Sequence, residues 1–139
     1  SLLHDIGYWI SHSQHHKNSY YIITHSDLPG FTNDEAEFIG NIARYHRKSL
    51  PKNKHSNYVS LPSDIQLKVD VLAGILRIAE GIDRRQKQYV KDIEVNYNNK
   101  IQIKLIPADP KIDIDIEIWG ANRRKQLLEE SLKKQIEII

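Results

Sequence analysis

Apolar side chains recur at spacings of three and four through the first 88 residues, and this period predicts helices. Thr32 with Glu35 three residues later is the pattern of a capping box at a helix start. In the longest helix we expect one apolar stripe with a carboxylate, Glu80, beside it. The helices are expected over residues 2–10, buried on most sides, and over about 17–26, 33–48 and 63–87. The stripe consists of Ile65, Val69, Leu72, Leu76, Ala79 and Asp83.

Beyond residue 88 the apolar period changes from 3.6 to 2, which marks an internal boundary. Alternating strands are expected over 93–97, 101–105 and 112–118, with a hairpin turn at Asn98-Asn99. An amphipathic helix is expected over 121–139. The predicted class is mainly α (α+β). Residues 1–88 would form a helical domain, and residues 89–139 a small three-stranded antiparallel sheet plus a closing helix.

Composition narrows the possible chemistry more than the possible partners. The chain has 139 residues, 40% of them hydrophobic, which suits one globular domain, or one with a small appendage. It has no cysteine, which excludes disulfides and thiol catalysis and fits a reducing, cytoplasmic setting. The net charge of +2 predicts no particular partner. Neither a membrane span nor a signal peptide is expected. Because the chain begins at Ser1 inside an apparent helix, we expect a fragment.

The dipeptide His4-Asp5 lies inside an apolar segment, and Glu80 and Asp83 lie on another mostly apolar helix. Burying ionisable groups is costly unless they are paired or bind a metal. Histidine and carboxylates brought together by helices can hold a divalent cation and activate water for phosphate ester hydrolysis. The other interpretation is a structural network in which Asp5 pairs with a buried histidine or arginine.

Further histidines and the basic residues also allow two interpretations. His16 and His46 either order neighbouring side chains between packed helices or line the same cleft as His4 and contact phosphate. Cations at the ends of helices are explained by the helix dipole. Arg123-Arg124-Lys125 is expected at a helix start, where the dipole disfavours it, which suggests an anionic partner. A phosphate chain suits such clusters. Nucleic acid is not expected, because no basic stripe interleaved with aromatic residues appears.

Several motifs occur in a particular order: His4 to Tyr8, His15 to Tyr21, Asp27 to Phe31, Ala43 to Lys48 and Leu76 to Arg84. Together they resemble the C-terminal domain of the exopolyphosphatase/guanosine pentaphosphate phosphatase (Ppx/GppA) family. The resemblance covers residues 2–88. It implies an HD-like helical domain that follows two actin-like domains carrying the phosphatase site. In bacteria, the parent protein would hydrolyse terminal phosphate from polyphosphate or guanosine pentaphosphate.

The resemblance also implies roles for this chain and its residues. The chain would bind polyphosphate and form a homodimer without being catalytic alone. His4 and Asp5 match the HD metal pattern, and Glu80 stands where the pattern has aspartate, so the implied cofactor is Mg²⁺ or Mn²⁺. The candidate phosphate-binding residues are Arg44, His46, Arg47, Lys48 and Arg84. The alternatives are a metal-dependent HD phosphohydrolase active on its own and a structural or dimerisation module.

Overall fold

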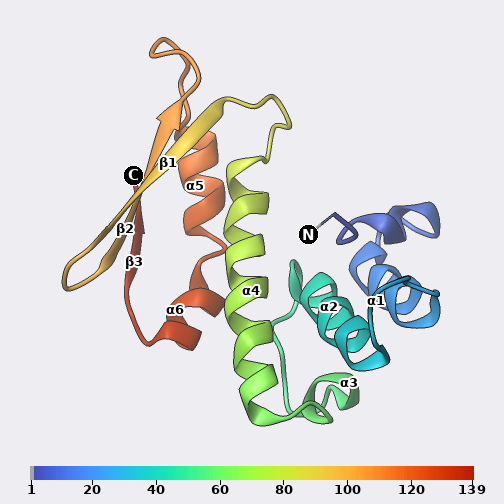
Figure 1. Cartoon of the computed structure of the whole chain (residues 1–139). Helices are drawn as coiled ribbons and strands as arrows, with labels where there is room; N and C mark the ends of the chain where they lie inside the picture. Colours follow the sequence, from blue (N-terminus) through green and yellow to red (C-terminus); the bar gives the residue numbers. More distant parts are fainter. Residues whose placement is uncertain (1) are drawn as a thin grey trace. The chain divides into compact units, whose positions relative to one another are not determined.

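The computed structural model describes residues 2–139 (Figure 1). It contains two compact units, with Ala73 the last residue of the first unit and Gly74 the first of the second. The division falls inside the longest helix, α4 (Ser63–Ile82), and β1 begins at Val90. The predicted domain boundary at residues 88 and 89 stays a prediction. Within residues 2–139, no helix has both the length and the apolar character that crossing a membrane requires.

The first unit contains η1 (Ile6–Trp9), α1 (His15–His25), α2 (Asn33–Tyr45), α3 (Ser56–Val59) and the first half of α4. Helices α1 and α2 pack side by side (Figure 1). The predicted capping box is confirmed: the Thr32 N–H donates to Glu35 Oε2 at 2.8 Å, and the Glu35 N–H donates to Thr32 Oγ1 at 3.2 Å. The core of the unit is formed by Ile23, Ala43, Tyr45, Tyr58 and Val69.

The opening segment differs from its prediction. Instead of a helix over residues 2–10, the structure has the four-residue 3-10 helix η1. The expected burial is wrong, since Leu2 is 99% and Trp9 90% exposed. The buried residue of η1 is Gly7: a Cβ atom placed on it would lie 2.0 Å from the carbonyl oxygen of His15. The segment is therefore held against α1 by a backbone contact at Gly7 and by the Tyr8 ring, which stacks on His15.

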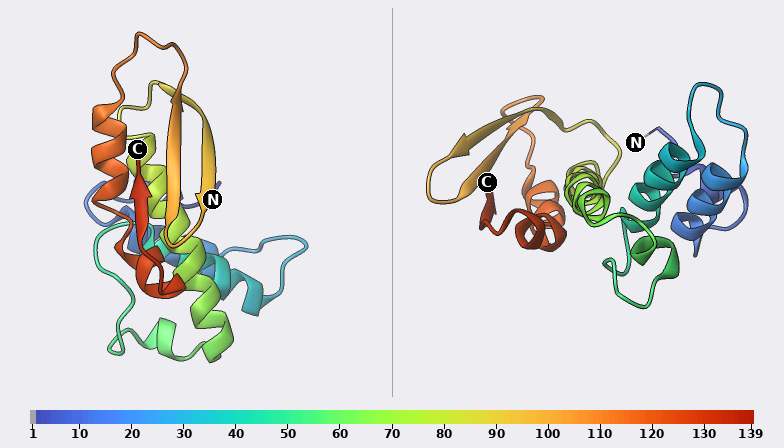
Figure 2. Two further views of the ribbon diagram at one scale, coloured as in Figure 1. Left: turned by 90° about the vertical axis from the view of Figure 1, so that its left-hand side faces the viewer. Right: turned by 60° about the horizontal axis from the view of Figure 1, so that its bottom comes forward.

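The second unit contains the rest of α4, β1 (Val90–Tyr97), β2 (Ile101–Pro107), α5 (Asp115–Asn122), α6 (Gln126–Leu132) and β3 (Ile136–Ile138). The strands lie in the order β1-β2-β3. Strands β1 and β2 are antiparallel and joined by the predicted turn after Tyr97, which pairs with Ile101. Strand β3 runs parallel to β2 (Figure 2), and the register places Ile103 opposite Ile138. The sheet is therefore mixed, and the prediction of a purely antiparallel sheet is wrong.

Residues 112–118 do not form the predicted strand. The structure has α5 from Asp115, and the third strand, β3, lies within the segment predicted as a helix. Ile114, Ile118 and Ala121 are spaced as neighbours on one helix face, so the alternating pattern concealed a helical one. Glu117 is 1% exposed and bound by Arg85. The mainly α class, the small three-stranded sheet and a helix after the hairpin are confirmed.

The predicted stripe of α4 is only partly correct. Val69 is fully buried as expected, but the other buried apolar positions of α4 are Ala73 and Ile78, whereas Leu72 is 42% exposed. Asp83 is exposed and follows the helix, which ends at Ile82. The buried face was misassigned because several faces of this helix carry large apolar residues.

Candidate functional site

The dipeptide His4-Asp5 is fixed against α1 by hydrogen bonds around Gly7. The Gly7 N–H donates to Ser19 Oγ at 2.9 Å, and the Ser19 hydroxyl donates to the carbonyl oxygen of His4 at 2.6 Å. Ser19 is fully buried. These contacts hold the turn before η1 beside the first residue of α1, His15.

Three side chains converge at this place and form what we call the histidine–aspartate cluster: Asp5, His15 and His46. Asp5 Oδ1 lies 3.2 Å from His15 Nε2 and 3.5 Å from His46 Nε2, and the two Nε2 atoms are 3.3 Å apart. Asp5 precedes η1, His15 begins α1, and His46 follows α2 as its C-cap. His15 and His46 are almost completely buried, whereas the Asp5 side chain is 38% exposed. The open side of the cluster is therefore the outer part of the Asp5 carboxylate, since the Oδ1 atom itself is buried.

The other ring nitrogens of both histidines contact backbone carbonyls. His15 Nδ1 lies 2.9 Å from the oxygen of His12, and His46 Nδ1 lies 2.5 Å from the oxygen of Ala43. A carbonyl oxygen only accepts hydrogen bonds, so each Nδ1 carries the proton. In a neutral ring, the Nε2 atom then presents a lone pair. Both lone pairs belong to the atoms that face Asp5.

Further side chains surround the cluster. His4 Nε2 is 3.4 Å from the other carboxylate oxygen of Asp5, and the Tyr8 ring stacks on His15 with centroids 3.8 Å apart. Arg47 Nη1 lies 3.4 Å from His15 Nε2. Burial lowers the pKa of His16 to about 4, with a smaller contribution from His15, so His16 is uncharged at neutral pH.

The candidate metal and phosphate residues are distributed over both units. In the first unit His4 adjoins Asp5, and His46 is buried in the cluster. The Arg44 guanidinium lies over the rings of Tyr20 and Tyr45, 5.7 and 5.8 Å from their centroids. Lys48 follows α2 with a positive φ of 61°. Glu80 and Arg84 belong to the second unit, where Glu80 Oε2 is 3.5 Å from Arg124 Nη1. The proposed roles of these residues stay predictions.

In the second unit, α4 and α5 approach closely at two glycines. A Cβ atom on Gly81 would lie 2.5 Å from the carbonyl oxygen of Gly120, and one on Gly120 would lie 2.6 Å from that of Gly81. The helix backbones are therefore in direct contact. This contact places Arg84, just after α4, near Arg123 and Arg124, just after α5.

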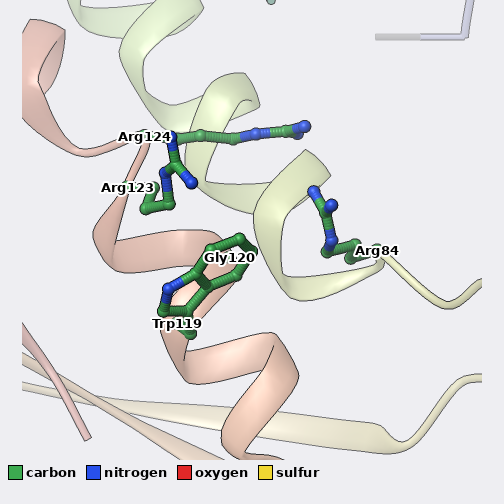
Figure 3. A pocket seen from close by; sticks show the side chains of 5 residues that line it. All are labelled: Arg84, Trp119, Gly120, Arg123 and Arg124. Carbon is green, nitrogen blue, oxygen red and sulfur yellow. The ribbon is translucent and has the colours of Figure 1, made fainter.

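These residues form a second site, which we call the arginine pocket, with a volume of about 320 Å³. The guanidinium carbons of Arg84 and Arg123 lie 5.2 and 4.9 Å from the centre of the Trp119 ring. Figure 3 shows Arg84 coming from the end of α4, and the other side chains coming from α5 and the residues after it. The lining residues are Arg84, Trp119, Gly120, Arg123 and Arg124.

The structure changes the explanation of the basic cluster after α5. The cluster lies between two helices: Arg123 is the C-cap of α5, where the dipole favours its charge, and Lys125 is the N-cap of α6, where the dipole disfavours it. The predicted helix start and its electrostatic conflict therefore hold for Lys125 and not for Arg123. What sets these cations apart is that three guanidinium groups line one pocket, with Glu80 Oε2 3.5 Å from Arg124 Nη1.

Sequence reasoning missed two of the residues that define these sites. His15 was not assigned as a partner of Asp5, although it lies in a recognised motif. Trp119 and Arg123 are four residues apart and so share a helix face, but this spacing is informative only if residues 115–122 are helical. The alternation of isoleucines across the same segment concealed that signal.

The class of protein follows from a comparison with known families, in which residues 1–135 match the description "Ppx/GppA phosphatase, domain III". The chain belongs to the Ppx/GppA phosphatase family, and the resemblance in the sequence motifs is confirmed. Guanosine-5'-triphosphate,3'-diphosphate pyrophosphatase of Vibrio parahaemolyticus is 36% identical over 115 residues, which are 83% of this chain and 20% of that protein. The protein of the same name from Pseudoalteromonas translucida is 42% identical over 50 residues, 36% of this chain and 10% of that protein. The chain spans about a fifth or less of the length of these curated relatives.

Proposed function

We propose that this chain is the phosphate-binding accessory domain of a phosphatase that removes terminal phosphate from polyphosphate or guanosine pentaphosphate. The reaction itself would occur on actin-like domains of the same polypeptide. Family membership and the names of the relatives support the phosphatase class and a guanosine phosphate substrate. The observation that carries the binding role is the arginine pocket.

The arginine pocket has the charge and the donors that a phosphate chain requires. Guanidinium groups stay protonated at physiological pH and donate paired hydrogen bonds to phosphate oxygens. Arg84 and Arg123 are exposed, so they keep their donors available to a ligand. Trp119 is 48% exposed, and its ring holds the guanidinium groups of Arg84 and Arg123 beside the pocket through cation–π contacts. A pocket of this size lies within the range of small-molecule sites.

Calorimetric titration of the chain with polyphosphate, GTP and inorganic phosphate tests this function. Arg84→Gln, Arg123→Gln and Arg124→Gln should each weaken polyphosphate binding about tenfold or more, since each removes charge-assisted hydrogen bonds. Lys87→Gln and Lys111→Gln remove equal charge from exposed positions of the same unit outside the pocket lining. These controls should change the Kd by about twofold or less. Equal effects in both groups would show only general electrostatic attraction and contradict the pocket.

The basic residues in the last turn of α2 and directly after it form a second phosphate-binding surface in this proposal. Arg47 borders the histidine–aspartate cluster, and Lys48 follows it at the end of α2. Arg44→Gln, Arg47→Gln and Lys48→Gln should weaken polyphosphate binding in the same titration. Loss of binding in these variants alone, with the pocket variants unaffected, would move the site to the first unit. Sedimentation of the chain tests the proposed homodimer.

A second candidate function is metal-dependent phosphohydrolysis by the chain itself. The observation that favours it is the convergence of Asp5, His15 and His46, with His4 beside Asp5. Phosphomonoesterase activity of the chain with Mn²⁺, abolished by Asp5→Asn, would establish it. No turnover at saturating Mn²⁺ would leave the catalytic role to other domains.

A further inference from the structure

We propose that Asp5 Oδ1, His15 Nε2 and His46 Nε2 bind one divalent transition-metal ion. This set differs from His4, Asp5 and Glu80, which the sequence motif implied, because it replaces two of those three residues. The inference does not depend on phosphate binding by the arginine pocket, which belongs to the other unit. Four properties of the cluster carry it: the spacing of the three atoms, the positions of protons, the rigidity of the rings and the open side.

The spacing of the three atoms is the spacing that a metal ion imposes. Bonds of about 2.0–2.1 Å at tetrahedral angles place ligand atoms about 3.3–3.4 Å apart. The three separations here are 3.2, 3.3 and 3.5 Å. One ion can therefore contact all three atoms without a change of backbone, although the three ligands come from three different elements of the first unit.

The positions of the protons leave three acceptors facing one another. Both Nδ1 atoms hold their protons toward backbone carbonyls, so the Nε2 atoms of neutral rings have lone pairs to offer. The third atom, Asp5 Oδ1, is buried, and in the described residues 2–139 no hydrogen-bond donor reaches it with good geometry. Three acceptors at such distances repel unless a metal ion or a proton lies between them, and one proton bridges only two of the three atoms. A metal ion satisfies all three at once.

The supporting contacts are those that metal-binding histidines require. A hydrogen bond from the other ring nitrogen fixes the tautomer and the orientation of each ligand. Here both histidines have such a bond, and His15 is also stacked on Tyr8. Their burial removes other rotamers, so the site is already arranged before an ion arrives. Two imidazoles and one carboxylate suit Zn²⁺, Fe²⁺, Co²⁺ or Mn²⁺ rather than Mg²⁺, which prefers oxygen ligands.

The open side, at the outer part of the Asp5 carboxylate, leaves room for further ligands such as water or a phosphate oxygen. Asp5 Oδ1 and both rings are buried, so these ligands would approach the ion past Asp5 Oδ2. Arg47 Nη1 lies 3.4 Å from His15 Nε2, longer than a usual N–H hydrogen bond. Its positive charge opposes an ion at this position. We therefore expect Arg47→Gln to raise metal affinity severalfold, whereas it weakens phosphate binding.

The test is calorimetric titration of the metal-stripped chain with Zn²⁺ and Mn²⁺, together with the visible absorption of Co²⁺. One ion per chain is expected, with Co²⁺ bands typical of nitrogen and oxygen ligands. Asp5→Asn, His15→Gln and His46→Gln should each weaken binding by about a hundredfold or more, beyond the usual effect of losing a supporting contact. Glu80→Gln and the exposed His25→Gln should stay within about threefold. His4→Gln removes only a contact of Asp5 and should cost about tenfold, less than loss of a ligand. Circular dichroism checks that each variant is folded.

Two results would overturn the assignment. If His4→Gln and Glu80→Gln abolish binding and His15→Gln does not, the motif set binds the ion instead. Uptake of less than one ion per chain would also overturn the assignment. In that case, nitrogen NMR of the wild-type imidazoles should show a doubly protonated ring paired with Asp5. Shifts of the Nε2 signals of His15 and His46 on adding Zn²⁺, with little change at Nδ1, would support the site without any substitution.

Discussion

The histidine–aspartate cluster and the arginine pocket are both positioned by close backbone contacts at glycine, but one presents hydrogen-bond acceptors and the other presents charged donors. In the first unit, Gly7 brings the turn with Asp5 against α1, and in the second, Gly81 and Gly120 bring α4 against α5. The first contact gathers hydrogen-bond acceptors, which attract a cation. The second gathers donors that are always charged, which attract anions. Backbone contact at glycine thus positions side chains, while the neighbouring residue types decide the ligand.

The two sites differ most in burial. His15 and His46 are at most 1% exposed, whereas Arg84 and Arg123 are exposed. Buried rings hold a fixed geometry, which metal coordination requires. Long exposed side chains can adapt to a phosphate chain of variable shape. Substitutions in the cluster should therefore change stability and affinity together, and substitutions in the pocket should change mainly affinity.

The largest expected effect is that of Gly7→Ala. The added Cβ would lie 2.0 Å from the His15 oxygen and 2.4 Å from the Ser19 nitrogen, both backbone atoms. We expect the free energy of unfolding to fall by more than about 3 kcal/mol, at the upper end of overpacking. Denaturant titration measures it. Ser13→Ala, at an exposed position, is the control and should change stability by about 0.5 kcal/mol or less. A Gly7→Ala loss below about 1 kcal/mol would refute the backbone contact.

Gly120→Ala applies the same test to the second unit. Its Cβ would lie 2.6 Å from the Gly81 oxygen, so α5 must move away from α4. A loss of about 2 kcal/mol in the free energy of unfolding is expected. Polyphosphate binding should weaken as well, because Arg84 and Arg123 separate. Wild-type stability with wild-type binding would show that the pocket does not depend on this crossing.

Glu117→Gln should destabilise the second unit in a pH-dependent way. The hydrogen bonds from Arg85, at 2.7 and 2.5 Å, lower the pKa of Glu117. This stabilisation is therefore present above the unfolded pKa, about 4.3, and is lost as the pH falls through the lower folded value. We expect a loss of about 2 kcal/mol at pH 7, below the usual cost because Arg85 is 31% exposed.

Thermal unfolding of both chains at neutral and acidic pH checks this effect. The difference between wild type and Glu117→Gln should shrink in acid. The matched control is Glu94→Gln, which breaks an exposed ion pair with Lys104 and should cost about 0.5 kcal/mol or less. A pH-independent difference at Glu117 would mean that the side chain acts through packing rather than charge.

The smallest expected effect is that of Thr32→Ala at the start of α2, the helix that leads to His46. Loss of the capping box should lower the free energy of unfolding by about 1 kcal/mol. Thr32→Ser keeps the hydroxyl and should restore most of it. Metal affinity should change little, because the C-terminal end of α2 is fixed by its own core residues, Ala43 and Tyr45. A large change in metal affinity would mean that His46 is less rigidly held than its burial indicates.

Much of the first unit could be predicted from the sequence, and less of the second. The prediction of helix α2 was correct because the capping box and the apolar period indicate the same helix. The strand predicted over residues 112–118 was wrong because the alternating isoleucines include Ile114 and Ile118, which are four residues apart and therefore neighbours on a helix. The buried Glu117 gave no local sign of its partner, Arg85, which lies 32 residues earlier. Pairing over such distances is decided by packing.

The sequence by itself determined the family, the capped start of α2 and the hairpin. It did so because motifs, caps and turns depend on residues close together in the chain. Only the tertiary structure decided that Asp5 faces His15 and His46, and that Arg84 shares a pocket with Arg123 and Arg124. Those sets join residues separated by 10 to 41 positions, and backbone contacts at Gly7, Gly81 and Gly120 bring them together.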